Sequence, residues 1–304
     1  PQENKADSAR MARQKRQVLT GIEIGSSTIK VLMGEFPGGE ELTILGSAQF
    51  PSLKVLKGGI VNANAVRDQL MKALAKAEQV SGLDVGPVFL SVTGGHIRVL
   101  TSVGRTGIQA SNRRIAEHHV VNAQENARGY FLQPDQRVLH HLDRRYLVDG
   151  EREVADPVGQ VASRLEADVL VVYGKHNSIE TSCRMVYDAL GYPAEDVAFA
   201  GIAAGFGALA TEEMERGALV IDIGAGVTEY VLFHGPGAFH CGQLTVGCEH
   251  VANDLAIGLR LPMPKCRKIL QELSQLGGTA EMTPDGRTRM REFETLGSAV
   301  RAIP

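Results

Sequence analysis

Residues 219–233 read LVIDIGAGVTEYVLF, two apolar runs of strand composition joined by a short turn. Gly224 and Gly226 permit positive φ angles, so the chain can reverse tightly and bring its backbone close to a ligand. Successive backbone N–H groups in such a turn form a concave site for an anion. Asp222, at the end of the first run, is placed to hold a hydrated Mg²⁺ beside a phosphate. Taken alone, the stretch fits an ordinary glycine-turned hairpin equally well.

A second copy of this pattern lies near the start of the chain. Residues 19–33 read LTGIEIGSSTIKVLM, in which Glu23 takes the place of Asp222 and Gly25 takes that of Gly224. Internal similarity at such a distance indicates duplicated domains. Two hairpins that face one another could hold a polyphosphate from both sides.

The two segments resemble the first and second phosphate motifs of the actin-like ATPase superfamily. The resemblance implies an α/β fold of two ribonuclease H-like domains around a nucleotide cleft, with ATP and Mg²⁺ as cofactors. Glu23 and Asp222 would hold the Mg²⁺ through water. Lys30 matches a lysine that some members direct at the β- and γ-phosphates; in other members this position is not lysine, and an exposed strand lysine is the alternative. The residues that would contact the nucleotide are Gly25, Ser26, Ser27, Thr28, Lys30, Asp222, Gly224, Ala225, Gly226, Thr228 and Gly247.

Length and composition are those of an ordinary globular protein. A chain of 304 residues allows about two domains, each with a substantial core. A net charge of −3 gives no electrostatic reason to expect nucleic acid or anionic lipid as a partner. No run approaches the roughly 20 apolar residues of a membrane span. The four cysteines show no C-x-x-C spacing, which favours reduced thiols in a cytoplasmic compartment.

Between the two hairpins the sequence alternates strand and helix patterns. We expect strands at 42–50 and 88–92, and a helix at 62–80 that Asn62 caps and Gly82 ends. Residues 98–175 break this rhythm and resemble a small inserted domain. Its expected elements are a strand at 98–108, a helix from Arg113, strands at 137–142 and 145–148, and an alternating strand within 164–173. A helix at 178–190, ended by Gly191, and a closely packed connector at 200–210 follow.

This order of elements resembles FtsA, the family of bacterial actin homologues in cell division. The matching motifs, which span most of residues 18–261, are GIEIGSSTIKVLMGE (21–35), KGGIVN (57–62), TGGHI (93–97), DPVG (156–159), FAGIAAGF (199–206), the second hairpin and VGCEHVANDLAIGL (246–259). The pilus-assembly protein PilM shares much of this layout and remains an alternative. A sugar or acetate kinase is a further alternative, but no motif for its catalytic Asp or its sugar-binding cleft is found. A chaperone-type ATPase is another, which would need a peptide-binding domain after the second domain.

The resemblance implies a division of the chain into domains. Residues 1–17 would be a disordered leader, 18–97 with 176–212 the first actin-like domain (1A), and 98–175 the inserted strand–helix–strand–strand domain (SHS2, 1C). Residues 213–304 would be the second actin-like domain (2A and the start of 2B), incomplete and without the loop that closes over adenine. Arg267 and Leu270 stand where the family commonly has Glu and Lys in the nucleoside pocket, so we expect poor discrimination between purines.

The resemblance also implies a role at the division septum. An FtsA-like protein would form actin-like filaments, bind the C-terminal tail of FtsZ, link FtsZ filaments to the cytoplasmic membrane and recruit later division proteins through residues 98–175. Membrane attachment would use a C-terminal amphipathic helix that these 304 residues do not contain. We therefore expect this chain to stay in solution with vesicles and to bind an FtsZ tail weakly. ATPase activity should be weak at most, because no residue that orients an attacking water can be identified.

Overall fold

The computed structural model describes residues 18–37, 42–109, 112–235, 237–275, 281–282 and 288–289. The chain divides into two compact units, Pro1–Gly247 and Cys248–Pro304. The first unit contains both hairpins and every residue predicted to contact the nucleotide. The expected leader, residues 1–17, lies outside the described residues.

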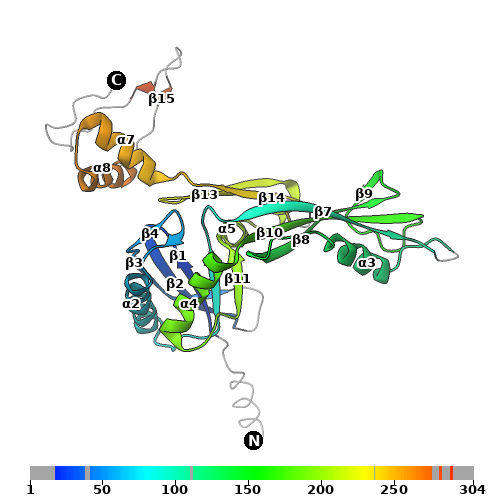
Figure 1. Ribbon diagram of the computed structural model, residues 1–304, viewed down its shortest axis with the longest axis horizontal. Coiled ribbons are helices and arrows are strands. Elements are labelled where there is room, and N and C mark those ends of the chain that lie inside the picture. The colour runs from blue at the N-terminus through cyan, green and yellow to red at the C-terminus, as the bar shows by residue number, and fades with distance from the viewer. Residues whose placement is uncertain are drawn as a thin grey trace, which may run out of the picture. The chain divides into compact units, whose positions relative to one another are not determined.

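A five-stranded sheet forms the base of the first unit. In spatial order its strands are β11 (Asp196–Phe199), β6 (Val88–Val92), β1 (Val18–Ile24), β2 (Thr28–Glu35) and β3 (Thr43–Pro51). β1 and β2 are the first predicted hairpin, and β6 runs parallel to both β1 and β11. The helices α2 (Ala63–Ser81) and α4 (His176–Leu190) contact each other and cover one face of this sheet (Figure 1).

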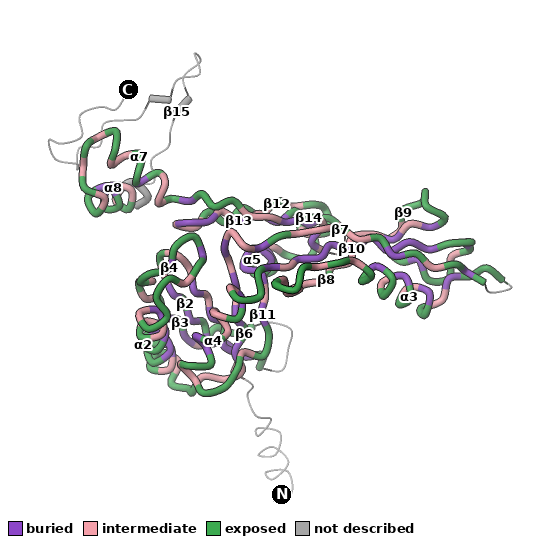
Figure 2. The backbone as a smooth tube through the Cα atoms, viewed as in Figure 1, coloured by how far each residue is buried: buried purple, intermediate pink, exposed green. Residues whose placement is uncertain are grey.

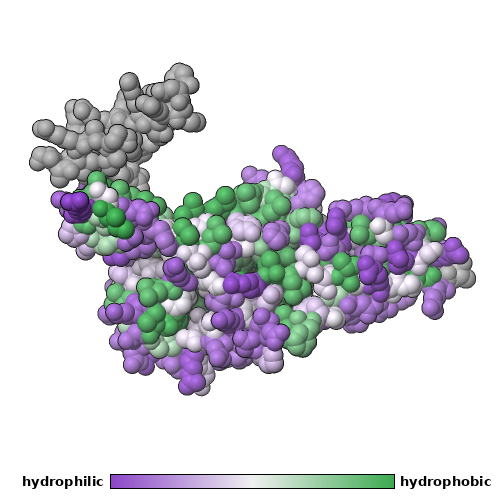
Figure 3. Space-filling view, turned by 45° about the horizontal axis from the view of Figure 1, so that its top comes forward, coloured by the Kyte–Doolittle hydropathy of each residue, from purple (hydrophilic) through white to green (hydrophobic). Residues whose placement is uncertain are grey.

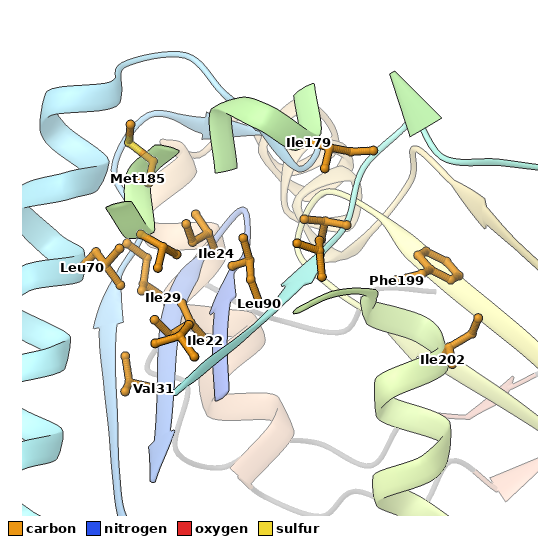
Figure 4. Packing of buried hydrophobic residues seen from close by; sticks show 14 of the residues in the cluster. Ile22, Ile24, Ile29, Val31, Leu70, Leu90, Ile179, Met185, Phe199 and Ile202 are labelled. Carbon is orange, nitrogen blue, oxygen red and sulfur yellow. The ribbon is translucent and has the colours of Figure 1, made fainter. Parts of the chain in front are cut away.

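The core of this layer comes from alternate residues of the hairpin. Ile22, Ile24 and Ile29 point toward the helices and are almost fully buried, in one cluster with Leu70 of α2 and Met185 of α4 (Figure 4). Burial of each such side chain contributes roughly 1.5–3 kcal/mol. The period of two in the strand therefore fixes which face of the hairpin carries the helices.

The ends of the two helices follow the sequence signals. The side chain of Asn62 accepts a hydrogen bond from the backbone N–H of Ala65 at 3.0 Å, which caps α2. Gly82 and Gly191 adopt positive φ angles of 71° and 79° directly after α2 and α4. Left-handed glycine at this position is the usual helix stop, so both predicted ends are confirmed.

A four-stranded antiparallel sheet follows in the order β7 (Arg98–Gly107), β10 (Arg164–Lys175), β8 (Gln136–Val148) and β9 (Arg152–Val154), with α3 (Glu117–Ala127) packed on one face. We call this part, together with its connections, the lobe. The prediction that β10 alternates between buried and exposed residues is wrong. Nearly all of it is buried (Figure 2), because α3 lies on one face and β14 contacts the other.

Two further predictions in the lobe are wrong. The helix begins at Glu117 rather than Arg113, because Arg113 has a φ of 50° and cannot lie in a right-handed helix. The strands expected at 137–142 and 145–148 are one strand, β8, which continues through a bulge opposite Asp168 and Val169. A bulge inserts one residue and shifts the alternation of side chains without ending the pairing. The sequence pattern is therefore interrupted and predicts two strands.

The second hairpin belongs to a three-stranded sheet of β12 (Ala218–Ile223), β13 (Thr228–His234) and β14 (Gly237–Leu244). The connector predicted at 200–210 is largely the helix α5 (Ala200–Ala208), followed by α6 (Thr211–Arg216). Its close packing is real, since a side chain on Gly205 would collide with the ring of Phe233. Apolar side chains of β12, including Ile221 and Ile223, remain exposed, and apolar surface gathers over this sheet (Figure 3).

The remaining elements are short or belong to the second unit. β4 (Val55–Leu56) and β5 (Gly59–Ile60) form a small hairpin in the first unit. The second unit contains α7 (Cys248–Leu259), α8 (Met263–Gln275), β15 (Glu281–Met282) and β16 (Thr288–Arg289). The predicted helix near Lys265 is α8, with Cys266 and Ile269 buried. No helix in the described part of the chain combines the length and apolarity needed to cross a membrane.

Candidate phosphate-binding site

The turns of the two hairpins line one cleft in the first unit, with a volume of about 150 Å³. A Cβ atom on Gly226 would lie 2.9 Å from Oγ of Ser26, so the two turns are in direct contact. Of the residues predicted to contact the nucleotide, those lining the cleft are Gly25, Ser26, Ser27, Thr28, Lys30, Asp222, Gly224, Ala225 and Gly226. The metal candidate Glu23 lines it as well.

Both turns are closed by the same backbone hydrogen bond. The N–H of Gly25 donates to the carbonyl of Thr28, and the N–H of Gly224 donates to the carbonyl of Val227, each at 2.9 Å. A Cβ atom on either glycine would lie 2.9 Å from that same carbonyl oxygen. The two turns are therefore structural repeats, and neither tolerates a side chain at this glycine without rearrangement.

Two glycine-containing loops lock the first turn in place. The hydroxyl oxygen of Ser26 accepts a hydrogen bond from the N–H of Gly58 at 2.9 Å. Gly58 and Gly94 have φ angles of 76° and 125°, and a Cβ atom on Gly58 would lie 2.6 Å from the Cα of Gly94. The sequence motifs KGGIVN and TGGHI thus meet directly beside the cleft, which their separation in the sequence does not reveal.

Glu23 and Lys30 form an ion pair at the mouth of the cleft. Nζ of Lys30 lies 3.0 Å from Oε2 of Glu23, and the side chains are 53% and 32% exposed. Exposed pairs of this kind contribute only about 0–1 kcal/mol, so a phosphate could exchange for the carboxylate at little cost. Lys30 is thus close enough to serve a ligand, although here it is bonded within its own hairpin.

Glu229 is a cleft residue that sequence reasoning missed. It is 3% exposed, and its Oε1 accepts a hydrogen bond of 2.5 Å from the hydroxyl of Thr93. Burial, reinforced by the charges of Asp222 and Glu23, raises the pKa of Glu229 to about 7, although the Thr93 hydrogen bond acts in the opposite direction. A signal existed in the sequence, because Glu229 lies two and four residues before Val231 and Phe233, the residues of strand β13 that pack into the core.

Thr228 and Gly247 do not line the cleft. The hydroxyl of Thr228 donates to the carbonyl of Val246 at 2.8 Å. A Cβ atom on Gly247 would lie 2.7 Å from the carbonyl carbon of Ala225. Both residues therefore brace the second turn against the segment after β14, and their predicted contact with nucleotide stays a prediction.

The donor groups suit Mg²⁺ held indirectly. Asp222, Glu23 and Glu229 supply carboxylate oxygens, the ligand type that Mg²⁺ prefers. Within the ranges that the structure describes, no three acidic, His or Cys side chains are grouped so that they could hold a metal ion directly. Mg²⁺ usually keeps several waters and binds through one or two carboxylates plus substrate phosphates, which fits this arrangement. The cleft is smaller than the 300–1,000 Å³ usual for small-molecule pockets, so it fits a phosphate group rather than a whole nucleotide.

The residues expected near the base lie in the second unit. Arg267 forms a bidentate ion pair with Glu249, with both N–O distances at 2.7 Å. This contact joins α8 to α7 and accounts for the arginine within the unit. Leu270 is half-buried on the same helix.

Comparison with known proteins identifies the lobe. The family model "SHS2 domain inserted in FTSA" matches residues 94–173, which contain β7, α3, β8, β9 and most of β10. The chain is 28% identical over 287 residues to the cell division protein FtsA of Pseudomonas aeruginosa, covering 92% of this chain and 68% of the relative. It is 28% identical over 247 residues to FtsA of Borreliella burgdorferi, covering 81% of this chain and 60% of the relative. Against FtsA of Escherichia coli the identity is 26% over 247 residues, 81% of this chain and 58% of the relative.

The chain thus spans between 58% and 68% of the length of these relatives. Among solved structures, a chain of the "PilM-PilN type IV pilus biogenesis complex" superposes with a TM-score of 0.61 at 17% identity, covering 85% of this chain and 70% of that one. Identity this low speaks to the fold alone. The fold is actin-like with an inserted SHS2 domain, and the resemblance to the FtsA family that the motifs predict is confirmed.

Proposed function

We propose that this chain is the nucleotide-binding part of an FtsA-like cell division protein that holds the phosphates of ATP with Mg²⁺ between its two hairpin turns. The observation that supports this most directly is the repeated turn. Two segments almost 200 residues apart in the sequence close with the same hydrogen bond and line one cleft with acidic side chains. An ordinary hairpin has no need of such a partner.

Each part of the cleft has a distinct role in this proposal. The backbone N–H groups of the two turns would donate hydrogen bonds to phosphate oxygens; these groups belong to Ser26, Ser27, Ala225 and Gly226. Lys30 would leave Glu23 and contact a phosphate, while Glu23 and Asp222 would hold the hydrated Mg²⁺. Bound Mg²⁺ would neutralise phosphate charge that these carboxylates otherwise repel.

We expect ATP hydrolysis to be slow or absent. Glu229 is the buried carboxyl nearest in character to a general base, because its pKa of about 7 suits proton transfer at neutral pH. It is, however, engaged by the hydroxyl of Thr93 and by the backbone N–H of Gly201. A carboxylate that already accepts two hydrogen bonds is poorly placed to orient an attacking water.

At the level of the cell, we propose an FtsA-like role at the cytoplasmic face of the membrane at the division septum. The chain would assemble into actin-like filaments, connect FtsZ filaments to the membrane, and contact other division proteins through residues 98–175. Residues 18–97 with 176–212 would act as the first actin-like domain and residues from 213 onward as the second. The similarity to FtsA over at least 81% of the chain supports these roles.

Isothermal titration calorimetry tests the cleft. Mg-ATP and Mg-GTP should bind weakly and with similar affinity, and Asp222→Ala should weaken both. Asp68→Ala is the matched control, since Asp68 is exposed on α2 and outside the cleft residues. Undiminished affinity in Asp222→Ala, or equal losses in both variants, would refute the assignment.

A further inference from the structure

Two consecutive arginines of the lobe reach the same buried carboxylate. Successive side chains of a regular strand point to opposite faces, yet Arg144 and Arg145 of β8 both contact Asp168 of β10, at 3.2 and 3.0 Å. The pairing explains this, because Asp168 lies opposite Arg145 while Val169 lies opposite Asp143. Arg144 is the extra residue of the bulge, and bulges re-aim side chains in this way.

Arg144 also contacts the sheet that contains the second phosphate turn. Its guanidinium carbon lies 4.1 Å from the centroid of the Phe239 ring, and Phe239 belongs to β14. The Arg144 side chain is 13% exposed, and its Nε is buried without a hydrogen-bond partner among the described residues. A buried ion pair with an unsatisfied N–H is a poor source of stability. Its geometry is better suited to fixing how two sheets meet.

A continuous path of strands connects Phe239 to the cleft. β13 starts at Thr228, directly after the second turn, and pairs with β14 through Leu232 opposite His240. The hydroxyl of Thr228 holds the segment after β14 through the carbonyl of Val246. Figure 1 shows β14 lying along the strands of the lobe. A movement of the second turn would therefore be passed to Phe239 by one small sheet.

The path continues to the far edge of the lobe. Arg145 also binds Glu153 of β9, with NH1 3.2 Å from Oε2. β9 is an edge strand of its sheet, so its outer backbone groups do not pair within that sheet. Asp168 thus lies between Arg144, which is close to the Phe239 ring at 4.1 Å, and Arg145, which is farther from that ring at 6.0 Å and binds the edge strand.

We propose that the contact between Arg144 and Phe239 couples phosphate binding at the second turn to the order of β8 and β9. The inference rests on the proposed function, because it needs a phosphate ligand in the cleft. Occupancy of the cleft would draw the second turn inward, shift β14 against Arg144 and tighten the pairs on Asp168. The edge strand that the lobe presents to a partner would then depend on the ligand state of the cleft.

Hydrogen–deuterium exchange with inorganic pyrophosphate and Mg²⁺ tests this in the full 304-residue chain. In the wild type, the ligand should slow exchange in peptides that cover β8 and β9. Phe239→Leu removes the ring but keeps an apolar side chain, so it should bind pyrophosphate in calorimetry and lose that slowing. Phe206→Leu is the matched control, because Phe206 packs against Phe233 of the same hairpin sheet. The ring that Arg144 and Arg145 lie over is that of Phe239, not Phe206. It should behave as the wild type.

Arg144→Lys provides a second variant in case Phe239→Leu folds poorly, since it keeps the charge but loses the planar stacking. It should also bind pyrophosphate without slowing exchange in β9. Retention of the slowing in either folded variant would overturn the inference, as would a wild type that binds pyrophosphate with unchanged exchange in β8 and β9. A wild type that does not bind pyrophosphate at all would instead refute the proposed function, and the coupling with it.

Discussion

The two hairpins share a turn but differ in their surroundings. β1 lies inside a five-stranded sheet between β6 and β2, whereas β12 pairs only with β13 among the described strands. Ile22 is 2% exposed beneath the helices, and its counterpart Ile221 is 55% exposed. The hydrogen bond that closes the turn is local and follows from the glycine and its neighbours. Burial of the flanking strand depends on elements far away in the sequence. Two copies of one motif can therefore be buried to completely different extents.

The residue opposite the acidic position differs as well. Glu23 pairs across the first hairpin with Lys30, while Asp222 pairs across the second with Glu229. An opposite-charge pair stabilises such a position and a like-charge pair destabilises it. At the first turn, Lys30 balances the charge of Glu23. At the second turn two acidic residues face each other, and a bound cation would reduce the repulsion between them. In the proposed function, Mg²⁺ would therefore contribute most at the second turn.

The largest effect should come from truncating the same position in each copy. Ile22→Ala should lower the free energy of unfolding by about 2–5 kcal/mol, because it leaves a cavity in the core. Ile221→Ala should change it by less than about 0.5 kcal/mol, because its side chain is exposed. Urea unfolding followed by circular dichroism measures both. Similar losses in the two variants would mean that β12 is covered in solution.

The next effect concerns Glu229 and depends on pH. Burial raises its pKa from 4.5 to about 7, so the folded protein holds this proton at pH values where the unfolded chain has lost it. Stability from this group is therefore present below about pH 4.5 and falls as pH rises toward 7, by up to about 3 kcal/mol. Glu229→Gln should be more stable than the wild type at pH 8 and not at pH 4.5, in thermal melts with EDTA.

Glu23→Gln is the control from the first hairpin, because it removes another carboxylate of the cleft, one that is partly exposed rather than buried. It should change stability little at either pH. A Glu229→Gln variant whose advantage does not grow between pH 4.5 and pH 8 would contradict the role of burial.

A smaller effect is expected where the two turns touch. A methyl group in Gly226→Ala would lie 2.9 Å from Oγ of Ser26 and 3.2 Å from the backbone of Lys57, so it should push the turns apart. We expect affinity for Mg-pyrophosphate to fall about tenfold, or roughly 1.4 kcal/mol. Gly237→Ala is the control, since nothing lies within 4 Å of its added methyl. Equal affinities in calorimetry would show that the turns need not touch.

The smallest effect should come from the ion pair of the first hairpin. Lys30→Met should lower the free energy of unfolding by less than about 1 kcal/mol, because both partners are partly exposed. The difference should shrink further in 1 M salt, where such pairs are screened. A large, salt-independent loss in urea unfolding would mean that Lys30 has a structural role beyond this pair.

Local signals in the sequence predicted the parts of the molecule that depend on local physics. Both turns, the Asn62 cap and the left-handed glycines after α2 and α4 lie where the sequence places them. The reason given for the second turn is wrong, however, because Gly224 and Gly226 do not adopt positive φ angles. Glu229 was missed because an acidic residue in a strand is usually on the exposed face, although its spacing from Val231 and Phe233 places it on the buried one. The bulge at Arg144 depends on the pairing with β10, which no single strand encodes.

The crossing of Gly58 and Gly94 has a thermodynamic consequence. Two left-handed glycines in backbone contact, with Ser26 hydrogen-bonded to one of them, leave the first turn few conformations to lose. Binding of a ligand there should cost the turn little conformational entropy, since the turn is already ordered before the ligand binds. Any conformational change on binding should instead involve the second turn, which Thr228 and Gly247 connect to the segment after β14, so that the two would move together. One side of the cleft is then fixed before the ligand binds, and the other side can move.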